Sequence, residues 1–159
     1  WASVAVSCRT AQDSTEDVLA DAREIVAASH DMGIQVKARI HDAFTNSNGD
    51  ATDPYVVHDV VLGLADLGTD VLIVTDGFAR ADVDEVVEMI EALLWFDVAG
   101  ESMMERLGYR GSLQGSLAAA QLGVTHFEAS TLKESDHYVG AKELAGALEE
   151  SGKELSLDW

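Results

Sequence analysis

The stretch Asp53–Gly77 reads DPYVVHDVVLGLADLGTDVLIVTDG and contains one complete helix-to-strand unit. Pro54 directly follows Asp53, as in a helix that begins with a capping carboxylate and a proline in its first turn. Apolar residues then recur at helical spacing up to Gly68, which predicts the helix end. The apolar, β-branched run Val71–Thr75 follows and predicts a buried strand.

The same succession recurs along the chain. Further strands are predicted at Val4–Cys8, Ile34–Ile40 and Val124–Ala129. Further helices are predicted from Ser14 to Gly33, from Asp82 to Leu94, from Ser112 to Leu122 and from Tyr138 to Glu150. The stretch Trp95–Gly111 breaks the rhythm, and a weak strand, an extended helix and a loop remain open for it.

Strands that alternate with helices predict an α/β fold, in which crossover helices connect a parallel sheet. Such βα units occur in βα barrels and in open doubly wound sheets. A complete barrel of eight units needs about 200 to 250 residues, and this chain has 159. We therefore predict one βα-repeat domain over residues 1–159.

The chain is strongly acidic: 29 Asp and Glu oppose 10 Lys and Arg, a formal charge of −19. This charge argues against nucleic acid and anionic membranes as partners, and no apolar run reaches the roughly 18 residues of a membrane span. A salt-adapted surface is the simplest interpretation of the charge. Cys8, the single cysteine, excludes an internal disulfide and is expected in the core. Together with the lack of a signal-peptide pattern, it predicts a cytoplasmic protein.

Polar residues stand just after the predicted strands, where parallel βα folds build their sites. Catalytic roles are predicted for Asp76, His41 and Glu128. A divalent metal, Mg²⁺ or Mn²⁺, would be held by Asp76, His41, Asp42 and Glu128, since imidazole and carboxylate ligands suit such ions. No Walker loop, GxGxxG or GxSxG motif is present to indicate nucleotide binding or serine hydrolysis.

Each of these residues also has a structural interpretation. Asp76 with Gly77 could form a turn, His41 could bond to a loop, and Asp42 could cap a helix. Glu128 could pair with a cation, and Arg39 is the candidate partner.

Several segments resemble, in the same order, the later units of the barrels of the hydroxymethylglutaryl-CoA lyase type. This superfamily includes 4-hydroxy-2-oxovalerate aldolases and isopropylmalate-type synthases. The segments that carry the resemblance are Val18–Ala28 with Gly33–Val36 and Ala43–Phe44, Asp53–Pro54 with Val56–Asp70, Val71–Gly77, Ser116–Val124 and Phe127–Ser130.

The resemblance implies a partial, half-type TIM-like barrel, with an open doubly wound sheet as the alternative. It implies a metal-dependent carbon–carbon lyase or aldolase acting on oxo-acids or acyl-CoA thioesters. The family's His-x-His ligand pair would fall in Met104–Leu107, which reads MERL, and its later loop is replaced by Thr131–Asp136. A non-catalytic scaffold or assembly subunit is therefore the alternative function. Because a half-barrel exposes sheet edges, a homo-oligomer or a partner subunit is expected.

Overall fold

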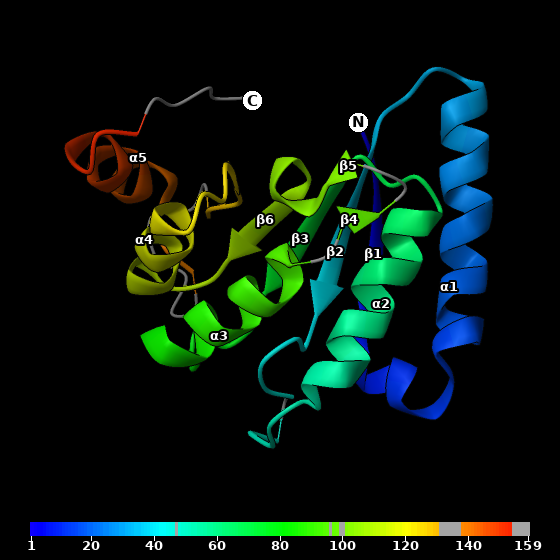
Figure 1. Ribbon diagram of the computed structural model, residues 1–159, viewed down its shortest axis with the longest axis horizontal. Helices are drawn as coiled ribbons and strands as arrows, with labels where there is room; N and C mark the ends of the chain where they lie inside the picture. The colour runs from blue at the N-terminus through cyan, green and yellow to red at the C-terminus, as the bar shows by residue number, and fades with distance from the viewer. Residues whose placement is uncertain (47, 96, 99–100, 131–137, 154–159) are drawn as a thin grey trace.

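One parallel sheet organises the molecule (Figure 1). The computed structural model describes residues 1–46, 48–95, 97–98, 101–130 and 138–153. The five strands of the main sheet lie side by side in the order in which they occur along the chain. They are β1 (Ala2–Ser7), β2 (Val36–His41), β3 (Val71–Thr75), β6 (Leu107–Arg110) and β7 (His126–Phe127).

A helix follows each of these strands, and the first four helices lead from one strand of the sheet to the next. The helices are α1 (Cys8–Asp31), α2 (Pro54–Asp66), α3 (Val83–Leu94), α4 (Leu113–Gln121) and α5 (Ala141–Glu150). Between α3 and β6 lie a small antiparallel pair, β4 (Asp97–Val98) and β5 (Glu101–Ser102), and the 3-10 turn η1 (Met103–Glu105). Within the described part of the chain, no helix combines the length and the apolar character needed to cross a membrane.

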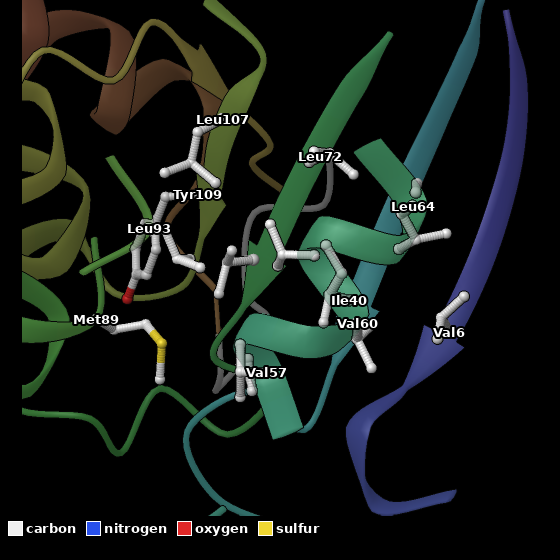
Figure 2. Close-up of a cluster of buried hydrophobic side chains, with 14 of the residues drawn as sticks. Val6, Ile40, Val57, Val60, Leu64, Leu72, Met89, Leu93, Leu107 and Tyr109 are labelled. Atoms are coloured by element: carbon white, nitrogen blue, oxygen red, sulfur yellow. The ribbon is translucent and has the colours of Figure 1, made fainter. Parts of the chain in front are cut away.

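The core lies between one face of the sheet and the helices. Along β2, Val36, Ala38 and Ile40 are fully buried, whereas the alternate residues are only partly buried. Figure 2 shows Ile40 and Leu72 of the sheet close to Val57, Val60 and Leu64 of α2. We call this side the helix-covered face and the opposite side the inner face, which carries Lys37, Arg39 and His41.

The strand order confirms the predicted fold class. In a doubly wound sheet the order reverses at a switch point, but here each new strand is added next to the previous one. That progression is the one found in a βα barrel. The alternative of an open doubly wound sheet is therefore wrong, and the five units form part of a barrel.

Most predicted elements are confirmed with shifted ends. The helix predicted from Ser14 begins earlier, at Cys8, but the backbone leaves helical geometry at Ser14 (φ −163°, ψ 99°). There the Ser14 hydroxyl accepts a hydrogen bond from the Asp17 amide at 3.2 Å, as a cap does. In the undecided stretch Trp95–Gly111, the structure places β6, which pairs with β3 and supplies the fourth strand of the sheet.

Candidate functional site

The carboxyl ends of the strands bring the candidate residues to one edge of the sheet. Ser7 at the end of β1 is in register with His41 at the end of β2. Thr75 at the end of β3 is in register with Arg110 at the end of β6. Glu128 directly follows β7, and its amide donates to the Tyr109 carbonyl. Parallel pairing alone therefore gathers polar groups at this edge.

Glu128 lies at the centre of a cationic cluster on the inner face. The Arg39 guanidinium donates two hydrogen bonds to its carboxylate, from Nε at 2.7 Å and from Nη2 at 3.0 Å. Lys37 Nζ lies 3.3 Å from Oε1, and Arg110 Nη1 lies 3.8 Å from Oε2. The predicted pairing of Glu128 with Arg39 is confirmed. We call Lys37, Arg39, Arg110 and Glu128 the inner-face cluster.

Two opposing effects act on the Glu128 carboxyl. Burial raises its pKa, but the hydrogen bonds and charges of Arg39 and Lys37 outweigh burial and lower the pKa overall. The carboxylate is therefore ionised at neutral pH, and three cations surround it. A carboxylate held in this way is unsuited to act as a general acid, because a general acid needs a raised pKa to hold its proton. The catalytic role of Glu128 stays a prediction.

Asp42 stabilises the loop after β2 through two hydrogen bonds. Its carboxylate accepts a hydrogen bond from the Ser7 hydroxyl at 2.9 Å, and its carbonyl accepts one from the Thr52 hydroxyl at 2.6 Å. Its backbone adopts a left-handed conformation, with φ of 55°, which aspartate tolerates better than most residues. These contacts tie the ends of β1 and β2 together.

Asp76 lies in the loop after β3 and is completely buried. One carboxylate oxygen accepts from the Arg80 amide at 3.2 Å, and the other accepts from the Ala81 amide at 3.1 Å. Burial raises the pKa of Asp76, while the amide hydrogen bonds act in the opposite direction. In this arrangement Asp76 holds the loop that leads into α3.

The four predicted metal ligands therefore do not form a ready-made site. In the ranges that the structure describes, no three His, Cys, Asp or Glu side chains gather in a way that could hold a metal ion. The Asp76 oxygens face backbone amides, and Glu128 faces cations. This donor set does not fit a divalent cation as it stands, and its assignment as a ligand set remains an untested prediction.

The segment Met104–Leu107, where the resemblance placed the His-x-His pair, contains no histidine. In the structure it spans the end of the 3-10 turn η1 and the first residue of β6. The replaced loop, Thr131–Asp136, lies outside the described residues.

Cys8 is a buried core residue, as predicted. Burial, reinforced by the nearby charge of Asp42, raises the pKa of its thiol to about 12. Cys8 therefore stays a thiol at neutral pH, whereas the thiolate is the nucleophilic form.

Sequence reasoning missed Lys37 and Arg110 as site residues. A signal for Lys37 was present in the strand sequence VKARIH, where charged residues alternate with apolar ones. Such alternation places Lys37, Arg39 and His41 on one face. No comparable signal identified Arg110, because its strand has only four residues and includes a glycine.

His41 is expected to titrate below the usual histidine range. Burial lowers the pKa of His41, and the positive charges of Arg110 and Arg39 lower it further, whereas the charge of Asp42 raises it. A lowered folded-state pKa means that protonation favours the unfolded chain. The stability contributed by neutral His41 is thus complete above about pH 6.5 and is lost as the pH falls through the folded-state pKa.

NMR titration of the His41 ring and urea unfolding of the wild type and His41→Gln from pH 7.5 to 5 will check this prediction. The wild type should lose more stability than the variant on acidification. A ring titration midpoint at or above pH 6.5 would contradict the expectation.

Comparison with known proteins identifies the fold. No protein-family model and no curated protein matches the sequence. Among solved structures, HMG-CoA lyase from Brucella melitensis superimposes with a TM-score of 0.81 and 18% identity, covering 98% of this chain and 60% of that one. The enzyme from Pseudomonas aeruginosa gives 0.80 and 18%, covering 98% of this chain and 57% of that one.

A third HMG-CoA lyase, from Acinetobacter baumannii in complex with coenzyme A and 3-methylmalate, gives a TM-score of 0.76 and 17% identity. The match covers 98% of this chain and 56% of that one. The chain thus has the fold of part of an HMG-CoA lyase-like TIM barrel and spans little more than half the length of these relatives.

Proposed function

We propose that this chain forms the substrate-binding part of a carbon–carbon lyase or aldolase of oxo-acids or acyl thioesters, within a barrel completed by further βα units. The inner-face cluster carries the proposal. Three of the ten Lys and Arg residues of a chain with charge −19 surround one carboxylate at a strand-end edge. Such a concentration of cations in an acidic protein favours an anionic ligand.

The substrate class follows from this charge and from the fold. Oxo-acids and carboxylated acyl thioesters carry the carboxylate that guanidinium groups bind well. The structural relative from A. baumannii was solved with coenzyme A and a dicarboxylic acid, which supports the same class.

His41 is the proposed proton carrier. In a retro-aldol cleavage, its neutral ring takes the proton of the substrate hydroxyl as the new carbonyl forms and the carbon–carbon bond breaks. The bonding electron pair passes to the carbon next to the original carbonyl and gives an enolate. His41 then returns the proton to that carbon. A lowered pKa keeps the ring neutral at pH 7, as a base requires.

The proposal predicts slow cleavage of a 4-hydroxy-2-oxo acid or of a 3-hydroxyacyl-CoA that carries a terminal carboxylate. His41→Gln should lower the rate by about 100-fold or more, since a positioned base contributes this much. Product release measured by chromatography, with and without Mg²⁺ or Mn²⁺, is the readout. Equal rates for the wild type and His41→Gln would count against the proposal.

The second candidate is a non-catalytic assembly subunit with a salt-adapted surface. The observation that favours it is edge strand β1, which among the described strands pairs with β2 alone and exposes Ser3 and Ala5 on the inner face. Exposed edges of this kind pair readily with other chains.

A dimer or larger assembly is accordingly expected by light scattering at 0.1 and 2 M KCl, with a higher melting temperature at high salt. Replacing Ala5 with lysine, a charge that protects natural edges, should weaken the assembly. A monodisperse monomer at each salt concentration would exclude this role, and an unchanged melting temperature would exclude salt adaptation.

A further inference from the structure

The inner-face cluster has more positive charge than its own carboxylate can neutralise. Lys37, Arg39 and Arg110 surround Glu128 alone, which leaves an excess of two positive charges among these four side chains. The cluster is open to solvent, because the cationic side chains remain 24% to 35% exposed. An anion from solution can therefore approach it.

The two arginines are used differently. Arg39 directs Nε and Nη2 at Glu128 and Nη1 at the Ser3 hydroxyl, so its three nitrogens all have partners. Arg110 reaches Glu128 only at 3.8 Å, which is too long for a hydrogen bond. Its Nε is buried and has no hydrogen-bond partner within the described part of the chain. Arg110 is the member with unused donors.

Aromatic contact holds the Arg110 guanidinium in place. Its central carbon lies 4.0 Å from the centre of the Tyr138 ring, a cation–π arrangement. This contact restrains the guanidinium on the Tyr138 side, and its N–H groups remain able to donate hydrogen bonds. A guanidinium edge matches the two oxygens of a carboxylate.

We propose that Arg110, with Lys37, binds the carboxylate of a small oxo-acid or dicarboxylate without a metal ion, and that Glu128 is a built-in competitor that limits the affinity. This inference rests on the proposed function for its choice of substrate class. The positive charge that a divalent cation would supply comes instead from fixed guanidinium groups. Glu128 keeps these groups paired while no ligand is bound, because an unpaired charge at a partly buried site is costly.

The test is calorimetric titration with oxalate and with pyruvate, at low ionic strength and in excess EDTA. We expect saturable binding by the wild type. Glu128→Gln keeps the size of the side chain and removes the competing charge, so it should bind about tenfold more tightly. Arg110→Gln should bind at least about tenfold more weakly.

Arg23→Gln is the matched control, because Arg23 lies exposed on α1 and the change removes the same charge from the chain. Its affinity should stay within about twofold of the wild type. Thermal melts of each variant will separate loss of binding from loss of fold. The double variant Arg39→Gln/Glu128→Gln removes Arg39 together with the Glu128 carboxylate that it pairs with, so no unpaired carboxylate remains in the inner-face cluster.

Three outcomes would overturn the proposal: no saturable binding by the wild type or Glu128→Gln, an equal affinity in Arg110→Gln, or binding that appears only when Mg²⁺ is added. The outcome is separable from that of the proposed function. Oxalate binding without turnover would reject the lyase and keep the carboxylate site. Turnover by the wild type, together with unchanged binding in Arg110→Gln, would support the lyase and reject the carboxylate site at Arg110.

Discussion

Asp76→Asn is expected to destabilise the protein by about 2 to 4 kcal/mol, the range for a buried charged group that loses hydrogen bonds. The Asp76 carboxylate is completely buried and accepts from the Arg80 and Ala81 amides. An amide side chain has one acceptor oxygen, so its NH₂ group would face one of these donors. Urea unfolding of the wild type and the variant will measure the difference.

Asp82→Asn is the matched control. The Asp82 carboxylate also accepts from a backbone amide, that of Glu85 at 2.9 Å, but this bond is exposed. Because asparagine caps helices about as well as aspartate, the control should change stability by less than about 0.5 kcal/mol. Similar losses in the two variants would show that burial of Asp76 is not what makes it important.

The same variant tests the predicted metal role. Titration with Mg²⁺ or Mn²⁺ by calorimetry should give equal heats for the wild type and Asp76→Asn, because the Asp76 oxygens are occupied by amides. Saturable binding that disappears in the variant would restore Asp76 as a metal ligand.

Gly115→Ala is expected to destabilise the protein by about 1 to 3 kcal/mol, the usual cost of overpacking a core. Alanine is the better helix former by about 1 kcal/mol, so propensity alone predicts the opposite sign. An added Cβ would lie 2.9 Å from Tyr109 Cζ and still closer to the hydroxyl oxygen. The Tyr109 side chain is fully buried among other core side chains (Figure 2), so a shift of its ring would disturb their packing.

Gly146→Ala in α5 is the helical control, because no atom lies within 4 Å of the added Cβ. It should stabilise the protein by roughly 0.5 to 1 kcal/mol. Tyr109→Phe removes the nearest atom, so Gly115→Ala should cost less in that background. Thermal unfolding of the wild type, Gly115→Ala, Tyr109→Phe and the double variant gives the coupling energy, and a value near zero would contradict steric contact as the cause.

The secondary structure was largely predictable because its signals are local. Asp53 and Pro54 start α2 as predicted, and the Asp53 side chain accepts from the Tyr55 amide at 2.9 Å. The five buried residues of β3 match the predicted range Val71–Thr75. For the stretch that holds β6, a weak strand was one of three open alternatives, because LGYR is short and contains glycine. Gly108 is needed there because a Cβ would lie 2.8 Å from the His126 carbonyl oxygen.

The site was less predictable, because a predicted strand end gives the backbone position of a residue but not the groups that its side chain contacts. His41, Asp42, Asp76 and Glu128 do stand at or just after strand ends, as predicted. The pairing of Glu128 with Arg39 was predicted, but those with Lys37 and Arg110 were not. Ser7 meets Asp42 across 35 residues, and a sequence separation of this size carries no local signal.

By itself the sequence determined the βα succession, the parallel sheet and the alternation that places Lys37, Arg39 and His41 on one face. These features depend on helical and strand periodicity and on capping, which act over a few residues. Only the tertiary structure decided that Asp76 braces a buried loop while Arg110 joins the cluster around Glu128. The reason is physical: burial and long-range pairing determine whether a polar group is already satisfied or still able to bind a ligand.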